Sequence, residues 1–554
     1  MRSFFIPNII LIIINVEEIH PLKCGSNMIK IKPKSLNVTE HKVHKNSALK
    51  SSSYTPIAIG YDFTTLKQPN SMSSSIFSKL KSLLQETREE FSKILQVRHT
   101  NINLTEYIED IIDICEVYTI GKDYPNFLIT NDLIIFPMFK NLGEGILAAA
   151  APCIIDEHLR PIAGVLYIND KLNFEMINAK FYMKNLLLHE ITHILAFHPF
   201  FFEHLGMSKV SGSMSSIISP KALAKAREHF GCESLSEIPL ENQGGSGSVG
   251  THWESRYMLG DYMISTDYPD ATISDITLAL FEDTGFYKVN YYSGGLFKFG
   301  KNKGCTFFRQ KCIENERATF DEFCHSAKEP ICSSSRAIKS SCYIVDYDVN
   351  LPKDYRYFSN PNKGGFFAAE YCPVPLEIYY ENDYFPNHCK IGKSHLPAEY
   401  GETIGKDSLC FMSSLLPNSS STAVNSQIPI CYSFSCDSIN KNIIIKLGSE
   451  KIICPKEGGI LNNPSGFKGN IVCPKYDEVC TSDNVVCNNI YDCFQEFASK
   501  NNYNYKTNYY DYSGSSVDLI DDYTDYIENV MVNKENFPIF NLALFILGLF
   551  LFFN

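Results

Sequence analysis

The chain has 554 residues, of which 44% are hydrophobic and 20% are charged, and its formal net charge is −12. This length exceeds what one hydrophobic core usually supports, so we expect two or more domains. The acidic balance, without a long basic run, argues against nucleic acid as a partner, because binding phosphates requires clustered Lys and Arg.

The N-terminus has the features of a secretory leader. Arg2 precedes an apolar run from Phe4 to Val16, which is too short to span a bilayer and has the length of a signal-peptide core. We therefore predict a signal peptide at 1–20, followed by a polar pro-segment at 21–52. Sequons at three asparagines fit the same compartment: Asn37, Asn103 and Asn418.

The next stretch alternates strand and helix patterns. Residues 55–63 and 127–139 resemble buried strands, and 75–97 carries apolar residues at helical spacing. Residues 161–170 resemble a further strand, and the alanine-rich 148–153 is interpreted as a turn before it. These patterns predict a mixed unit of strands and helices.

The strongest helix pattern of the chain comes next. It covers residues 181–197, which contain no Gly or Pro. A second helix is predicted at 219–230, with Ser219 and Pro220 at its start. The glycine-rich residues 242–250 indicate a flexible loop.

The cysteines gather in the C-terminal half. Of the 19, four precede residue 300 and fifteen lie between Cys305 and Cys493. This density is typical of disulfides formed in an oxidising compartment, and the absence of Cys-x-x-Cys pairs disfavours metal clusters. We expect a loop-rich, disulfide-bonded domain at 301–495 and a polar stalk at 496–536.

The last residues, 537–554, are almost uninterrupted apolar sequence without a basic flank. An apolar tail preceded by polar sequence is the pattern of a removable GPI signal. The alternative is a retained membrane helix, because about 18 apolar residues also suffice to span a bilayer. Either interpretation makes the membrane a partner of this chain.

The helix at 181–197 contains the pattern H-E-x-x-H, formed by His189, Glu190 and His193. Histidines four residues apart share one face of a helix and can bind one zinc ion. Bound Zn²⁺ lowers the pKa of its water, and the glutamate takes the proton as that water attacks a carbonyl. The pattern indicates hydrolysis of amides. The alternative is a purely structural role, with two histidines hydrogen-bonded on a buried helix.

The residues alone leave the third ligand open. His198 lies five residues after His193. On a continued helix its side chain would point partly away from the face that carries His189 and His193. Glu203 and His204 could reach back only after a sharp turn. His252, beside the single tryptophan Trp253, is distant, but the cost of closing a loop grows slowly with its length.

Four blocks, in order, resemble the leishmanolysin family of surface metalloproteases, a branch of the metzincins. They are AAAAPCIIDEHLRPIAGVLYIND, HEITHILAF, ENQGGSGSVGTHWESRYMLGDYM and LALFEDTGFY, within residues 140–290. The resemblance implies an insertion before the third histidine. It assigns His189, His193 and His252 as zinc ligands, Glu190 as general base and Met263 as the Met-turn residue, and makes His198 a bystander.

Two further positions follow from the resemblance. Ala196 stands where the metzincin pattern has Gly, and a left-handed Ala would cost about 1 to 2 kcal/mol unless the turn is delayed toward Pro199. Cys24 lies where leishmanolysins carry a pro-segment cysteine that caps the zinc; otherwise it is a disulfide partner. Without Cys24, three and fifteen cysteines remain in the two portions, so complete pairing requires a disulfide between them.

We therefore expect an α+β fold, with a metzincin-like catalytic domain, made of a mixed sheet and the zinc-site helix, before the cysteine-rich domain. Its subdomains are expected at 53–198 and 199–300. The predicted function is a secreted or surface-anchored zinc endopeptidase made as a zymogen, with one Zn²⁺ per chain and proteins or peptides as substrates. The alternative is a surface adhesion or binding protein that keeps the metzincin fold, with or without zinc, but has lost catalysis; Ala196 motivates it.

Overall fold

The computed structural model describes most of the chain between residues 53 and 480. The described residues are 23–24, 33–35, 53–98, 108–117, 131–178, 180–212, 214–243, 245, 247–266, 268, 271–291, 297–376, 387–390, 392–480 and 511. The predicted signal peptide and the apolar tail lie outside these residues, and so does the predicted stalk apart from Asp511.

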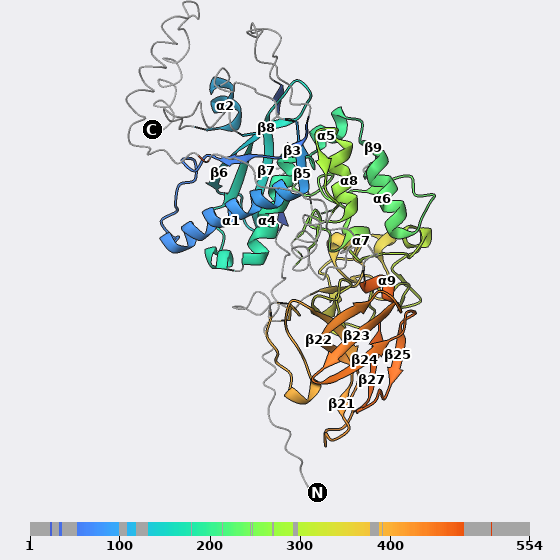
Figure 1. Ribbon diagram of the computed structural model, residues 1–554. Helices are drawn as coiled ribbons and strands as arrows, with labels where there is room; N and C mark the ends of the chain where they lie inside the picture. Colours follow the sequence, from blue (N-terminus) through green and yellow to red (C-terminus); the bar gives the residue numbers. More distant parts are fainter. Residues whose placement is uncertain are drawn as a thin grey trace, which may run out of the picture.

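The N-terminal part is built on a six-stranded mixed sheet with the order β1-β7-β8-β6-β4, in which β2 also pairs with β7. Figure 1 labels three of its strands, β6, β7 and β8. Strands β4, β6 and β8 run parallel, and β7 runs antiparallel to β8. The strands are β1 (Lys23–Cys24), β2 (Lys34–Ser35), β4 (Ile59–Tyr61), β6 (Leu133–Lys140), β7 (Ile146–Ile155) and β8 (Pro161–Asn169).

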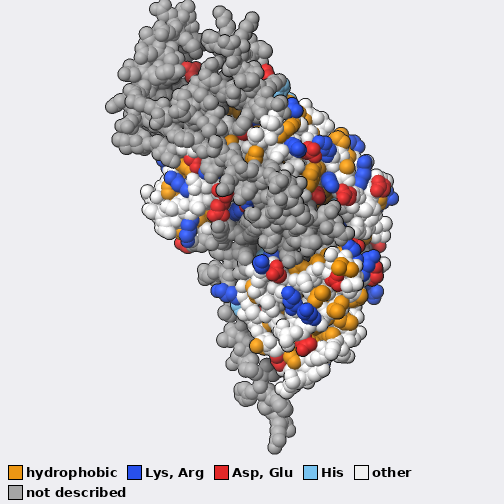
Figure 2. Space-filling view, viewed as in Figure 1, with side chains coloured by type: hydrophobic (Ala, Val, Ile, Leu, Met, Phe, Trp, Pro, Cys, Tyr) orange, Lys and Arg blue, Asp and Glu red, His pale blue; other side chains and the backbone are white. Residues whose placement is uncertain are grey.

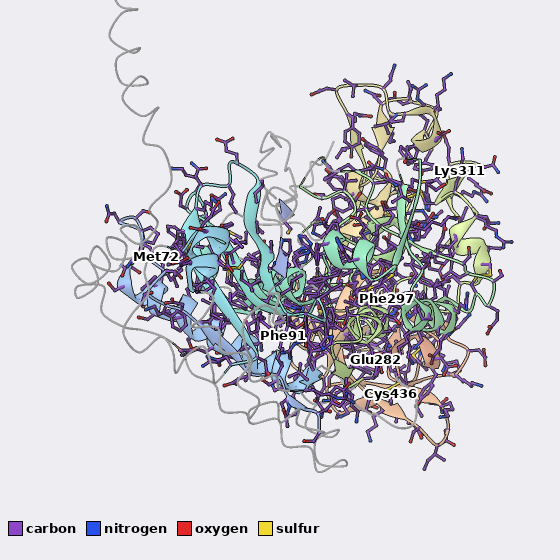
Figure 3. The ribbon with its side chains drawn as sticks, turned by 90° about the horizontal axis from the view of Figure 1, so that it is seen from above. Met72, Phe91, Glu282, Phe297, Lys311 and Cys436 are labelled. Atoms are coloured by element: carbon purple, nitrogen blue, oxygen red, sulfur yellow. A yellow bond between two sulfur atoms is a disulfide. The ribbon has the colours of Figure 1, made fainter. Side chains whose placement is uncertain are left out.

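Helices cover both faces of this sheet, because successive residues of a strand point to opposite sides. On β6, Leu133 and Ile135 belong to the core shared with α1 (Ser74–Ile94) and α4 (Lys180–Leu195), the helix of the H-E-x-x-H pattern. Ile134 and Phe136 instead pack in the core shared with α2 (Ile108–Cys115). Figure 3 labels Phe91 near the end of α1, where its side chain is fully buried.

The alanine-rich residues 148–153 are not a turn, so that prediction is wrong. They form the middle of β7, where every side chain is buried. Small side chains allow α4 to lie close to the sheet: a Cβ added to Gly164 on β8 would stand 2.4 Å from Cγ2 of Ile194. Close packing against a helix outweighs the low strand propensity of Ala.

The other helix and strand predictions of this part are confirmed with shifted ends where the residues are described. Helix α1 ends at Ile94, and the next three residues form β5 (Leu95–Val97). The predicted strand at 55–63 is divided into β3 (Thr55–Pro56) and β4, which belong to different sheets. Part of the predicted strand at 127–139 lies outside the described residues.

The central residues form short helices around a small sheet. Helix α6 (Pro220–Phe230) begins after Ser219 and ends at Gly231, whose φ of 66° is favourable for glycine. The other elements are η3 (Phe174–Asn178), α5 (Pro199–His204), β9 (Ser208–Ser211), β10 (Met214–Ile217), β11 (Ile238–Pro239), α7 (Ser255–Met258), α8 (Asp275–Asp283) and β12 (Lys288–Val289).

The cysteine-rich part is more regular than its sequence predicts, because it contains a six-stranded antiparallel sheet with the order β24-β23-β22-β20-β27-β25. These strands are β20 (Ser408–Ser413), β22 (Ile428–Asp437), β23 (Asn442–Leu447), β24 (Glu450–Cys454), β25 (Gly459–Asn462) and β27 (Asn470–Cys473), and helix α9 (Tyr476–Val479) follows them. Smaller elements are η4 (Cys305–Phe308), β13 (Ile313–Glu314), β14 (Arg317–Ala318), β15 (Pro330–Cys332), β16 (Lys339–Tyr343), β17 (Val345–Asp346), η5 (Lys353–Tyr355), β18 (Lys363–Gly364), η6 (Phe367–Ala369), β19 (Val374–Leu376), η7 (Ala398–Tyr400), β21 (Leu416–Pro417) and β26 (Phe467–Lys468).

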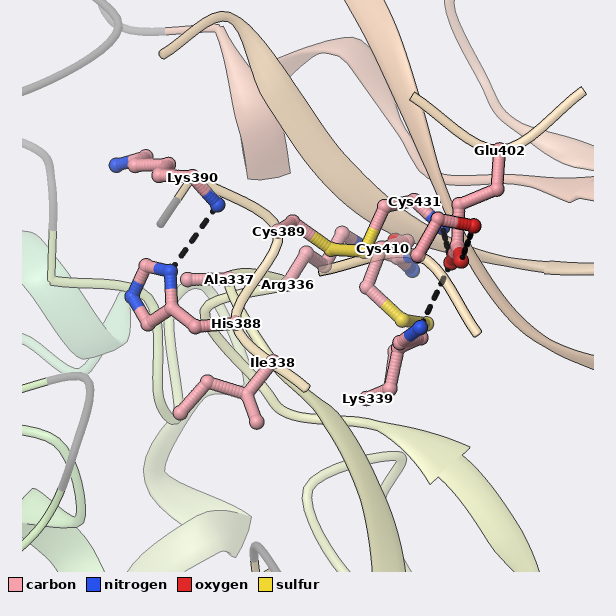
Figure 4. Close-up of a disulfide and its surroundings, with 12 residues drawn as sticks. Arg336, Ala337, Ile338, Lys339, His388, Cys389, Lys390, Glu402, Cys410 and Cys431 are labelled. Atoms are coloured by element: carbon pink, nitrogen blue, oxygen red, sulfur yellow. Dashed lines mark hydrogen bonds and ion pairs between the residues drawn. A yellow bond between two sulfur atoms is a disulfide. The ribbon is translucent and has the colours of Figure 1, made fainter. Parts of the chain in front are cut away.

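Disulfides join these elements, as the cysteine pattern predicts. Cys232–Cys305 is the expected bond between the two portions of the chain. Figure 4 shows Cys389–Cys431, which lies close to the ion pair of Lys339 with Glu402. The described pairs are Cys115–Cys153, Cys232–Cys305, Cys312–Cys372, Cys324–Cys342, Cys332–Cys410, Cys389–Cys431, Cys436–Cys480 and Cys454–Cys473.

The visible surface in Figure 2 carries basic and acidic side chains interspersed with one another. Among the described residues, no helix is both long enough and apolar enough to cross a bilayer.

Candidate metal centre

Helix α4 presents two of the predicted ligands. His189 and His193 lie one turn apart on its buried face, and their ring centroids are 4.8 Å apart. The helix is fixed from both sides: the sheet lies beneath it, and Lys184 Nζ lies 2.6 Å from Glu90 Oε1 on α1. The two imidazoles are therefore held by a rigid element.

The chain leaves this helix without a left-handed residue. Ala196 does not have a positive φ, so the strain considered for this position is absent. The carbonyl of Thr192 accepts hydrogen bonds from both Ala196 and Phe197, each at 2.9 Å. His198 then caps α5, with its Nδ1 accepting the amide of Phe200 at 3.2 Å. The turn is delayed toward Pro199, as the second expectation for this position proposed.

The loop after β11 places His252 beside helix α4. The amide of Glu241 donates to the carbonyl of His252 at 2.9 Å, and the amide of Gly250 donates to the carbonyl of Glu241 at 2.9 Å. The next residue, Trp253, is fully buried, and its Nε1 donates to Thr277 Oγ1 at 2.7 Å. Hydrogen bonds on both sides thus fix the backbone that carries His252.

The three imidazoles converge through their Nε2 atoms. His189 Nε2 lies 3.2 Å from His252 Nε2 and 3.1 Å from His193 Nε2. The thiol of Cys24 joins them, with Sγ 3.3 Å from His193 Nε2, and the four ligand atoms lie within 4.8 Å of one another. Zn–N bonds of about 2.0 Å in a tetrahedron place ligand atoms about 3.3 Å apart, so the cluster has the size of a zinc site.

The opposite ring nitrogens fix the tautomers. His189 Nδ1 lies 2.5 Å from the Tyr262 carbonyl, and His193 Nδ1 lies 2.7 Å from the Phe197 carbonyl. His252 Nδ1 likewise lies 2.9 Å from the carbonyl of Ser248. Because a carbonyl only accepts hydrogen bonds, each Nδ1 carries the proton, and each Nε2 directs its lone pair into the cluster.

Burial also keeps these rings neutral. Desolvation lowers the pKa of His189 to about 4 and that of His252 to about 3. Desolvation, reinforced by the two neighbouring histidines, lowers the pKa of His193 well below its usual value. Metal binding requires unprotonated imidazoles, so the site is prepared to bind a cation at neutral pH.

Glu190 and Cys24 meet beside the histidines. The Glu190 side chain is fully buried, and its Oε2 lies 3.5 Å from Cys24 Sγ. Cys24 is carried by β1, which pairs in parallel with β7 and brings the thiol from the predicted pro-segment to the cluster. Among the described cysteines, it is the one without a disulfide.

The predicted Met-turn residue lies on the loop that contacts α4. Met263 is fully buried, and its amide donates to Asp261 Oδ1 at 2.7 Å. The carbonyl of Met263 accepts the amide of Trp253 at 2.9 Å, so this loop is joined to the His252 segment. Between them, Tyr262 contacts Thr192 on α4 through its hydroxyl, at 2.8 Å.

The other histidines near the motif do not join the cluster. His198 is a helix cap, and His204 Nδ1 contacts the carbonyl of Phe200 at 2.8 Å on an exposed part of α5. The contacts of Tyr262, Phe197 and Ser248 were not predicted, because backbone carbonyls leave no signal in a motif.

A cleft opens beside His189. Its accessible walls are mostly apolar, and Cys24 is one of the residues that line it. The polar side chains in the lining include Asn185, Asp261, Ser265 and Thr266. The apolar lining comes from β7, α4 and the loop after Met263: Leu147, Leu186, Ile264, Tyr268 and Ala271.

Comparisons with known proteins identify the family of this chain. The leishmanolysin family profile matches residues 76–487. The chain is 29% identical over 379 residues to a leishmanolysin homolog of Crithidia fasciculata, covering 64% of this chain and 56% of that protein. It is 26% identical over 390 residues to leishmanolysin of Leishmania major, covering 66% of this chain and 63% of that protein.

A leishmanolysin-like peptidase of Drosophila pseudoobscura is 29% identical over 309 residues, which cover 49% of this chain and 45% of that protein. The chain thus matches less than two thirds of the length of these relatives. The profile, however, spans the zinc-site helix, the His252 segment and most of the cysteine-rich part. The chain therefore belongs to the leishmanolysin family of zinc metallopeptidases.

Proposed function

We propose that this protein is a zinc metalloendopeptidase that hydrolyses proteins or peptides. The observation that carries the proposal is the convergence of three imidazole Nε2 atoms, each with its Nδ1 on a backbone carbonyl, beside the buried Glu190. Membership of a metallopeptidase family supports the same reaction.

The roles follow from the donor set. His189, His193 and His252 would hold Zn²⁺, which supplies an acidified water and a Lewis acid for the substrate carbonyl. Glu190 takes the proton from the attacking water and delivers it to the leaving amine. A general base must lie within hydrogen-bond reach of the proton that it takes. Glu190 is suited to this role, because its Oε2 lies 3.5 Å from Cys24 Sγ, at the side of the cluster where the water would bind. The apolar cleft beside His189 would receive a substrate side chain.

We propose that Cys24 keeps the enzyme latent. The thiol occupies the side of the cluster next to Glu190, and a thiolate ligand would exclude the catalytic water. Removal of the segment that carries β1 would open both the fourth ligand position and the cleft, since Cys24 lines that cleft.

We propose an extracellular location at the cell surface. The eight described disulfides favour an oxidising compartment. Attachment through residues 537–554 stays a prediction from sequence. Mass spectrometry of the mature C-terminus would detect either a GPI remnant or a retained Asn554.

The alternative of a non-catalytic adhesion protein has lost its motivation. It rested on strain at Ala196, and this residue does not have a positive φ. The enzyme interpretation requires only residues that are present in the chain.

The test is hydrolysis of a quenched peptide library by the secreted protein after removal of the pro-segment. Glu190→Ala should abolish hydrolysis while the protein still binds zinc. Glu203→Ala changes an exposed glutamate on the next helix and should leave the rate unchanged. Wild-type protein that binds one zinc per chain but cleaves no peptide would instead favour the adhesion protein.

A further inference from the structure

One residue close to the C-terminus lies against the N-terminal sheet. The Asp511 carboxylate forms an ion pair with Arg88 of α1, whose side chain is only 3% exposed. The same oxygen, Oδ1, accepts the amide of Tyr61 at 3.0 Å, and Oδ2 accepts the side-chain amide of Gln85 at 3.2 Å. Both carboxylate oxygens are therefore bound, by donors from two elements.

The position of this carboxylate is set by the sheet. Strand β4 is the end strand of the six-stranded sheet, and its parallel pairing with β6 leaves every second amide on the outer side. The amide of Asp62 donates inward to Ile135, whereas that of Tyr61 donates to Asp511. Edge amides are normally protected in some way, and here a carboxylate covers one of them.

The Arg88 guanidinium also has a contact within the N-terminal part. The Arg88 guanidinium lies over the Tyr61 ring, 5.7 Å from its centroid, on a helix that packs against α4. A buried guanidinium beside an outward-facing edge amide matches the geometry of a carboxylate, because both groups present N–H donors in a fixed arrangement.

We propose that Arg88, Gln85 and the Tyr61 amide form a carboxylate-binding site whose ligand is Asp511, and that this site fastens the C-terminal stretch to the N-terminal part. Residue 511 then lies beside α1 and the end strand β4 of the six-stranded N-terminal sheet. This inference goes beyond the peptidase proposal and does not depend on it.

The consequence is positional. Helix α1 is joined to α4 by the ion pair of Glu90 with Lys184. Asp511 is therefore held at a fixed place relative to the metal centre.

The test measures limited trypsin cleavage of the full chain at a lysine close to Asp511. Trypsin cleavage after Lys506, five residues before Asp511, is followed by mass spectrometry of the released C-terminal fragment. Asp511→Asn should accelerate this cleavage by at least about tenfold, because a fastened segment is cleaved only when it opens. Asp518→Asn, the same chemical change further along the stretch, should leave the rate unchanged.

A second set of variants tests Arg88 in the same cleavage experiment. If Arg88 and Asp511 act as a pair, Arg88→Gln should accelerate cleavage, and the double variant should be no faster than Asp511→Asn. Arg88→Lys keeps the cation and guards against a folding defect; it should give an intermediate rate. Hydrogen exchange at the Tyr61 amide should rise in Asp511→Asn. Equal cleavage rates for Asp511→Asn and Asp518→Asn, with unchanged exchange at Tyr61, would overturn the proposal.

Discussion

The Nδ1 of His189 lies 2.5 Å from the carbonyl oxygen of Tyr262, a residue 73 positions further along the chain. The hydroxyl of the same tyrosine lies 2.8 Å from Thr192, one turn further along α4. One residue of the Met263 loop thus contacts the zinc-site helix at two points. This arrangement restricts rotation of the His189 ring and of the loop at the same time.

We predict that Tyr262→Phe weakens zinc binding by a few-fold, and by less than the ~10-fold typical of losing a direct partner of a ligand, because it loosens the residue whose carbonyl orients His189. The backbone carbonyl stays, and only the contact with Thr192 is lost. Competition with a chelator of known affinity measures the change. Tyr432→Phe removes a buried tyrosine hydroxyl from Ser413 in the distant sheet and is the matched control. Equal zinc affinity of the two variants would show that the second contact does not hold the site.

Gly164→Ala should lower the free energy of unfolding by about 1 to 3 kcal/mol, because an added Cβ would overlap Ile194 of α4. The control is Gly405→Ala, where an added Cβ meets nothing within 4 Å. Chemical denaturation with the disulfides intact measures both variants. A destabilisation of the same size in the two proteins would mean that close approach of α4 to β8 is not the cause.

Cys24→Ala should give a protein that cleaves peptides while the pro-segment is still attached, because the thiol no longer occupies the cluster. The expected rate is lower than that of the processed enzyme, since β1 still pairs with β7 beside the cleft. Ser26→Ala, two residues away, should stay latent. A Cys24→Ala protein as inactive as the unprocessed wild type would contradict the proposed latency mechanism.

Acid should destabilise the fold through its buried histidines. Desolvation lowers the pKa of His388, which is 2% exposed, to about 3, below the value of about 6.5 expected for the unfolded chain. Between these values the unfolded state binds the extra proton, so stability is full above pH ~6.5 and falls as the pH drops toward 3. The slope is about 1.4 kcal/mol per pH unit for this group.

His388→Gln should therefore show a shallower loss of unfolding free energy over that pH range. His395→Gln, at an exposed position, serves as the control. An unchanged slope in His388→Gln would assign the acid sensitivity to other groups.

The sequence predicts the zinc-site helix and the α6 helix, because both have strong periodic patterns and identifiable ends. It misassigns residues 148–153, since strand formation there depends on packing under α4, which a local pattern does not contain. It also misses the regular sheet in the cysteine-rich part, where frequent Gly, Pro and Asn obscure short strands. Long-range pairing within that sheet decides its structure.

The candidate site was predictable only as far as motif and resemblance reach. H-E-x-x-H indicates His189, Glu190 and His193 by helical spacing, whereas His252 was left open by spacing and was assigned by resemblance. The delayed turn after Ala196 depends on hydrogen bonds to Thr192, and sequence alone left two possibilities for it. The carbonyl partners of the Nδ1 atoms are set by tertiary folding and have no sequence signal.

We propose that His189, His193 and His252 together hold one zinc ion. The most direct measurement is the zinc content of the purified, processed protein by elemental analysis, compared between His252→Ala and His198→Ala. We predict one zinc per chain in the wild type and in His198→Ala, and almost none in His252→Ala. Full zinc in His252→Ala, or loss of zinc in His198→Ala, would contradict this account.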